Sequence, residues 1–122
     1  MATISSESPV FTVMIDFTLE GGAQGELIRL VESIAEVSSR QRGFISASVH
    51  RSVDGRRVFN YAQWKSRADY EKYLLSPELQ ERGRELQQFM ERNSAQLNWN
   101  FYQVVSCFEA QAPVQRPLQS NE

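Results

Sequence analysis

The sequence predicts a single α+β domain in which helices cover one face of a four-stranded antiparallel sheet. Its 122 residues suffice for one domain with a hydrophobic core but not for two. The apolar periodicity changes along the chain in the order strand, helix, strand, strand, helix, strand. Asp54-Gly55 lies between the middle two strands, as the turn of an antiparallel hairpin does. A βαββαβ order of this kind closes most readily into an antiparallel sheet with one helical layer.

The first half of the pattern contains a strand, a helix and a second strand. The strand is expected over Val10–Leu19, which is rich in β-branched and aromatic residues and ends at Gly21-Gly22. A helix follows from about Ala23 to Arg40, because apolar residues recur there at helical spacing. Gly43 can adopt the left-handed conformation of a helix end, and the second strand then covers Phe44–Arg51.

The second half contains a third strand and a helical segment in two parts. The strand is expected over Arg57–Trp64, and Ser66 follows it as the N-cap of a short helix. Ser76-Pro77 interrupts that helix, because proline suits the first position of a new helix after a serine cap. The new helix is expected over Glu78 to about Arg92.

A final strand is expected over Leu97–Phe108, where aromatic and β-branched residues return. The domain then comprises residues 10–109, preceded by a flexible segment at 1–9. Residues 110–122 are expected to form a mobile tail, because their prolines and polar side chains have little to bury.

Composition narrows the classes of function. The net charge is −2 with both signs mixed along the chain, which argues against nucleic-acid and membrane-surface partners. One cysteine, Cys107, excludes an internal disulfide and a cysteine-rich zinc site, and the single His50 argues against a histidine-based metal centre. Met1–Pro9 is polar where a signal peptide needs an apolar core, and no later run has membrane-spanning length. A soluble cytoplasmic protein is therefore expected.

The sheet face away from the helices is expected to be covered as well. The first, second and fourth strands carry apolar residues on both sides. The tail is too polar to cover them, so a second copy of the chain is the better candidate, sheet against sheet. The sequence therefore predicts a homodimer.

The segment Asn60-Tyr61-Ala62-Gln63-Trp64 is the strongest candidate for a site. Strand alternation points Asn60, Ala62 and Trp64 to one face, where an amide and an indole flank a small residue. Such a face suits a flat ligand better than a dry core. No glycine-rich phosphate loop, Ser/His/Asp order, paired-cysteine motif or helical His-Glu motif accompanies it.

The rest of the site depends on the register of the hairpin. A two-residue turn at Asp54-Gly55 pairs Val53 with Arg56 and sends His50 to the face opposite Asn60. A three-residue loop pairs Ser52 with Arg56 instead and separates polar from apolar side chains between the two faces. It gathers Ser46, Ser48, His50, Asn60 and Trp64 on one face and leaves Ile45, Ala47, Val49, Phe59 and Tyr61 on the other.

The second register is preferred because of that separation. Each polar side chain left unpaired beneath a helical layer costs on the order of 1–3 kcal/mol, which favours a cavity holding ligand or water.

With these residues in view, the chain resembles the antibiotic biosynthesis monooxygenase superfamily, most closely the cofactor-free anthrone oxygenases of aromatic polyketide pathways. The resemblance covers about Val10 to Phe108 and is strongest from Gly43 to Tyr70. It implies a dimeric α+β barrel of ferredoxin-like subunits, each with a cavity between sheet and helices, and no cofactor. By motif position it implies an active site made of these residues: Asn60, Trp64, Tyr70, His50 and Arg84.

The first functional hypothesis is a cofactor-independent monooxygenase that converts an anthrone-type phenol into a quinone with dioxygen. In it, Asn60 and Trp64 stabilise the carbanion and hydroperoxide, His50 or Tyr70 moves protons, and Arg84 offsets negative charge. A second is a small-molecule binder with the same cavity and no chemistry. A third, haem binding or degradation, ranks last because the helices carry no histidine to serve as an axial ligand.

Overall fold

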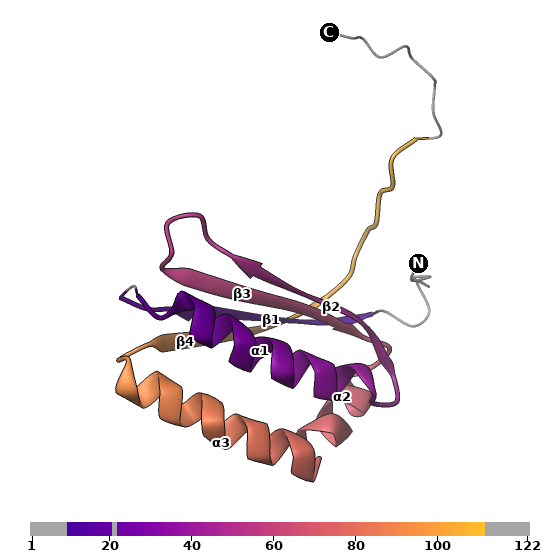
Figure 1. Ribbon diagram of the computed structural model, residues 1–122. Helices are drawn as coiled ribbons and strands as arrows, with labels where there is room; N and C mark the ends of the chain where they lie inside the picture. Colours follow the sequence, from indigo (N-terminus) through magenta and orange to yellow (C-terminus); the bar gives the residue numbers. More distant parts are fainter. Residues whose placement is uncertain (1–9, 21, 112–122) are drawn as a thin grey trace, which may run out of the picture.

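A computed structural model describes residues 10–20 and 22–111, so the expected flexible segment 1–9 and most of the expected tail lie outside the described residues. Within the described part, one antiparallel sheet contains the strands β1 (Phe11–Thr18), β2 (Phe44–Arg51), β3 (Arg57–Trp64) and β4 (Gln96–Gln103). Their order is β2-β3-β1-β4, so β1 and β3 are central (Figure 1). The predicted α+β class, with a ferredoxin-like topology, is confirmed.

The described helices are α1 (Gln24–Ser39), α2 (Arg67–Leu74) and α3 (Pro77–Arg92). They lie on one face of the sheet, with α1 across β2 and β3 and α3 alongside α1 (Figure 1). Because α3 packs mainly against α1, the half of the sheet formed by β1 and β4 is less closely covered than the other half.

Two serine caps divide the second helical segment as predicted. The Ser66 hydroxyl accepts a hydrogen bond from the Asp69 N–H at 3.1 Å and begins α2. The Ser76 hydroxyl accepts one from the Leu79 N–H at 3.2 Å, with Pro77 at the first position of α3. Each cap satisfies a backbone donor that the first helical turn leaves free, so the chain changes direction between two stable helices.

Gly43 allows β2 to begin close to α2. Its φ is +87°, in the left-handed region that the sequence predicted. A Cβ atom at this position would collide with the Asp69 side chain in the first turn of α2. A larger residue would therefore displace α2, which carries Tyr70.

The last strand is shorter than predicted, because β4 ends at Gln103 and not at Phe108. Gln103 pairs with Phe11, the first residue of β1, so the neighbouring strand ends there too. One further backbone bond joins the Val104 N–H to the Val10 carbonyl at 3.2 Å. Strand-forming residues continue beyond this point, but they have no partner strand among the described residues, and the segment leaves the body of the domain (Figure 1).

The preferred hairpin register is wrong, and the other register is the one observed. Val49 lies opposite Asn60, and His50 lies opposite Phe59. Side chains alternate along a strand, so His50 and Asn60 point to opposite faces of the sheet.

The loop closure explains this register. Ser52 pairs with Arg57: its N–H donates to the Arg57 carbonyl at 3.0 Å, and its hydroxyl accepts from the Arg57 N–H at 2.9 Å. The Asp54 carboxylate accepts from the Ser52 hydroxyl at 2.7 Å and from the Arg56 N–H at 3.0 Å. These side-chain bonds fix a loop longer than either expected turn.

A bulge in β2 changes the pairing at the start of that strand. The register shifts between Phe44 and Ser46, and Phe44 lies opposite Trp64 as a result. Asn60, Ala62 and Trp64 share the helical face as predicted, with Phe59 and Tyr61 on the outer face.

The hydrophobic core consists of two clusters on the helical face. One cluster contains Phe11, Val13, Val37, Trp64, Tyr70 and Tyr73. The other contains Phe17, Leu19, Leu27, Val31, Val58 and Phe89. Ile15 is partly buried and packs against both, so the two clusters meet at the level of Ile15 and its strand partner Asn60.

Candidate active site

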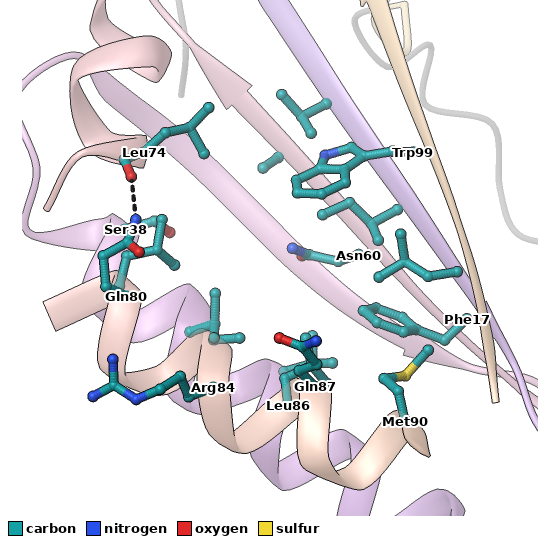
Figure 2. A pocket seen from close by; sticks show the side chains of 18 of the residues that line it. Phe17, Ser38, Asn60, Leu74, Gln80, Arg84, Leu86, Gln87, Met90 and Trp99 are labelled. Carbon is teal, nitrogen blue, oxygen red and sulfur yellow. Dashed lines mark hydrogen bonds between the residues drawn. The ribbon is translucent and has the colours of Figure 1, made fainter. Parts of the chain in front are cut away.

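A cavity of about 890 Å³ lies between the sheet and the helices, with lining residues from β1, β3, β4 and all three described helices. Most of these residues are apolar (Figure 2). Its size falls in the range of roughly 300–1,000 Å³ that small-molecule sites occupy. The cavity therefore has the volume and lining of a site for an apolar ligand.

The strand register fixes the floor of the cavity. Asn60 on β3 lies opposite Ile15 on β1, and Ile15 lies opposite Trp99 on β4. In the adjoining row, Ala62 lies opposite Val13. The floor is thus broad and made of aliphatic side chains, with an amide on one side and an indole on the other.

Asn60 is the polar group at the centre of this floor. It is 7% exposed, and its Oδ1 atom is buried without a hydrogen-bond partner among the described residues. Figure 2 shows the amide projecting from the sheet into the space between the sheet and the helices. An unpaired buried carbonyl costs on the order of 1–3 kcal/mol, so the site favours a ligand or water that donates a hydrogen bond there.

Trp64 closes one end of the cavity. Only 1% of it is exposed, and its ring stacks on Tyr73 at 5.0 Å between centroids. Phe44 meets it edge-on at 5.5 Å. Trp64 is therefore a wall of the cavity that also belongs to the core.

Tyr70 reaches the cavity from α2. It is buried, and its ring centroid lies 5.8 Å from that of Trp64. Burial raises the pKa of Tyr70 to about 12, and a hydrogen bond with the Trp99 side chain partly opposes this shift. Burial also raises the pKa of its neighbour Tyr73. Both phenols are neutral at physiological pH, so Tyr70 can donate a proton or hydrogen bond but does not act as a base.

Arg84 lines the cavity from α3 but is exposed to solvent. Figure 2 shows its guanidinium pointing away from Asn60. Across residues 10–20 and 22–111, no ion pair within 4.0 Å involves Arg84. Its charge is thus at the rim and free to meet an anionic group that enters the cavity.

His50 does not line the cavity, contrary to expectation. The observed register places it on the outer face, where its Nε2 lies 3.0 Å from the Ser48 hydroxyl and its ring lies 5.8 Å from that of Phe59. Ser46 and Ser48 are exposed on the same outer face. The structure therefore brings together four of the five expected residues.

Sequence reasoning missed Trp99, Gln87 and Glu91, all of which line the cavity. Alternation along a strand does not show which neighbouring strand Trp99 lies against, because the pairing of β4 with β1 is a property of the whole sheet. The α3 residues sit one helical turn apart, with Gln87 Nε2 3.5 Å from a Glu91 carboxylate oxygen. Helical spacing alone did not show which face of α3 borders a cavity.

Among residues 10–20 and 22–111, no three histidine, cysteine, aspartate or glutamate side chains are grouped so that they could hold a metal ion. None of the helices in that part of the chain is both long and apolar enough to cross a membrane.

Fold and cavity together define a small-molecule site inside a ferredoxin-like domain. The chain belongs to the antibiotic biosynthesis monooxygenase family, whose model matches residues 10–82. This confirms the family to which the motif from Gly43 to Tyr70 pointed.

Individual relatives support the same placement. The chain is 41% identical over 81 residues to tetracenomycin-F1 monooxygenase of Streptomyces glaucescens, a match covering 66% of this chain and 72% of that protein. The monooxygenase ActVA-Orf6 of Streptomyces coelicolor, solved with the ligand nanaomycin D, has a TM-score of 0.67 at 25% identity, covering 90% of this chain and 100% of that one. SnoaB, a cofactor-independent oxygenase from Streptomyces nogalater, shares the fold with a TM-score of 0.67 at 17% identity, covering 86% and 99%.

Proposed function

We propose that the protein is a cofactor-independent monooxygenase that oxidises an anthrone-type polycyclic phenol to a quinone with dioxygen. The observation that carries this proposal is the unpaired Asn60 amide oxygen on the floor of a broad apolar cavity. A flat hydroxylated aromatic fills such a cavity and supplies the missing donor. The relatives support the choice, since one is named as a tetracenomycin-F1 monooxygenase and another is described as cofactor-independent.

The proposed reaction needs no electrons beyond those of the substrate. Loss of a proton from the methylene carbon of the anthrone gives an enolate, which transfers one electron to dioxygen. The resulting radical and superoxide combine, and with a proton they form a hydroperoxide at that carbon. Loss of water across the O–O and C–H bonds then leaves a carbonyl, so one anthrone and one dioxygen give one quinone and one water.

The cavity residues have distinct roles in this scheme. Asn60 binds the substrate oxygen and stabilises the enolate, as a preorganised dipole does in a site that excludes water. Tyr70, held neutral by burial, donates a proton to the forming hydroperoxide. Trp64 closes the end of the cavity, and Arg84 offsets negative charge at its rim.

We do not assign proton removal to His50, because its imidazole lies on the other face of the sheet. Glu91 is the one carboxylate among the described residues that line the cavity. We therefore assign removal of the substrate proton to Glu91.

Oxygen consumption tests the proposed function directly. Anthrone is added to the protein in the presence of a strong metal chelator, and oxygen uptake and quinone absorbance are followed together. We expect one quinone for each oxygen consumed, a rate proportional to protein concentration, and a loss of about a hundredfold in Asn60→Ala. A rate equal to that of the buffer, with anthrone still bound, would identify the protein as a binder without chemistry.

Haem binding or degradation gains no support from the site. The chain has one histidine, and it lies on the face opposite the cavity. Haem titration gives a simple check: a Soret band lost in His50→Ala would require haem to bind on the outer face.

We also propose that the protein forms a homodimer through the outer face of its sheet. Met14, Phe59 and Tyr61 lie on that face and are only partly covered within one chain. Burying them against a second copy removes apolar surface from water. Light scattering with size-exclusion chromatography is expected to give twice the mass of one chain, and Tyr61→Glu is expected to give a single chain.

A further inference from the structure

Trp99 is unusual for a tryptophan that faces the helical layer. Of the two tryptophans in the chain, Trp64 is 1% exposed, whereas Trp99 is 48% exposed although it lines the cavity. Burial of a large apolar side chain stabilises a fold, and the half-exposed indole of Trp99 leaves part of that stabilisation unused. An open indole surface inside a cavity marks a place for a ligand.

The register places Trp99 and Asn60 in one row across the sheet, with Ile15 between them. Adjacent strands lie about 4.8 Å apart, so the backbones at Asn60 and Trp99 are separated by roughly 10 Å. Figure 2 shows the indole and the amide over the same stretch of sheet, facing the side chains of α3. A planar molecule bound to Asn60 and resting on Ile15 extends toward Trp99.

The indole is held on the cavity side of the sheet by its neighbours. Trp99 lines the cavity together with Tyr70. Phe101, the next inward-facing residue on β4, packs against Tyr70 at 5.9 Å and stacks on Phe11 at 5.7 Å between ring centroids. The strand that carries Trp99 is thus packed, through Phe101, against the aromatic group that contains Tyr70 and Phe11.

We propose that Trp99 is a specificity-determining residue that contacts the distal ring of the substrate and selects polycyclic ligands long enough to reach it from Asn60. This proposal rests on one part of the proposed function, namely that an aromatic substrate binds in the cavity. Ligands of three or four fused rings meet both residues at once, whereas two-ring ligands contact one of them at a time.

Binding of two quinones of different length tests this proposal. Dissociation constants for a dihydroxyanthraquinone and a hydroxynaphthoquinone are measured by calorimetry with the full chain and its variants. Trp99→Ala is expected to weaken the three-ring ligand about tenfold, through loss of aromatic contact, and to leave the two-ring ligand within about twofold. Trp99→Phe, which keeps an aromatic ring, is expected to lower the affinity for the three-ring ligand about threefold and to leave the affinity for the two-ring ligand unchanged.

The control is Phe108→Ala, which removes an exposed aromatic side chain beyond the end of the same strand. It is expected to change neither dissociation constant. If Trp99→Ala and Trp99→Phe weakened the binding of both ligands equally, Trp99 would have only a structural role. An unchanged dissociation constant for the three-ring ligand in Trp99→Ala would also refute the proposal. Because binding is measured without turnover, length selection without oxygen uptake would refute the proposed chemistry and leave this inference intact.

Discussion

Replacing Asn60 with leucine separates the functional role of this residue from its contribution to stability. The amide is 7% exposed, and its Oδ1 atom has no hydrogen-bond partner among the described residues. Leucine has the same branching at Cγ and brings no polar atom into the cavity. We therefore expect Asn60→Leu to be more stable than the natural protein and to lose its activity.

The magnitude follows from the desolvation of one amide. Removing an unpaired buried carbonyl relieves on the order of 1–3 kcal/mol, and the apolar replacement adds favourable burial. The free energy of unfolding is thus expected to rise by about 1–3 kcal/mol. For a domain of this size, the melting temperature rises by roughly 4 °C for each kcal/mol.

Urea denaturation monitored by circular dichroism measures this change, with quinone formation assayed on the same preparation. Gln88→Leu, at an exposed amide on α3 that does not line the cavity, serves as the control and is expected to stay within about 0.5 kcal/mol. A destabilised Asn60→Leu protein would mean that Asn60 satisfies a structural need in the unliganded fold. Retained turnover in this variant would refute the catalytic role.

Three further predictions concern other residues. His50→Ala is expected to keep turnover within about twofold, because the imidazole lies outside the cavity. Glu91→Gln is expected to lower kcat at least tenfold, because it removes the proposed base. Steady-state rates that fall in His50→Ala but not in Glu91→Gln would identify His50 as the base. Burial raises the pKa of Tyr70 to about 12, whereas in the unfolded chain it keeps the ordinary tyrosine value of about 10. The free energy of unfolding is therefore unaffected by this group below pH 10 and is expected to fall by about 2–3 kcal/mol as pH rises from about 10 to about 12. Urea denaturation between pH 9 and pH 12 is therefore expected to show a smaller decline in Tyr70→Phe than in the natural protein, and identical declines would contradict the burial argument. At Gly83, which lines the cavity with open space around it, alanine is expected to raise the free energy of unfolding by about 0.5–1 kcal/mol with little change in KM. Leucine at the same position is expected to raise KM by filling the cavity, and an unchanged KM would place the substrate elsewhere.

Local rules predicted most of the fold from the sequence. Alternation placed Asn60, Ala62 and Trp64 on one face, and serine caps placed the starts of α2 and α3. These features depend on a few neighbouring residues, and the structure confirms them. The predicted end of β4 was wrong, because strand-forming residues continue beyond the point where the partner strand stops.

The hairpin register was wrong because the criterion used to choose it was too general. Sorting polar from apolar side chains assumes that only one face is polar, but both faces of this hairpin carry polar groups, with Asn60 inside and His50 outside. The decisive interactions are those of Ser52 and Asp54 in the loop, whose hydroxyl and carboxylate fix the pairing of Ser52 with Arg57. Trp99 was missed for a related reason, since its place in the site depends on the pairing of distant strands.

The central claim is that the substrate lies on the sheet beneath α3, bound to Asn60. A crystal structure of the protein with a dihydroxyanthraquinone, the product-like ligand, tests it most directly. The predicted result is a flat ligand over Ile15 and Val13, with a hydroxyl donating to Asn60 Oδ1 and the far ring against Trp99. A ligand bound on the outer face of the sheet, or a cavity that stays empty at saturating ligand, would contradict the account.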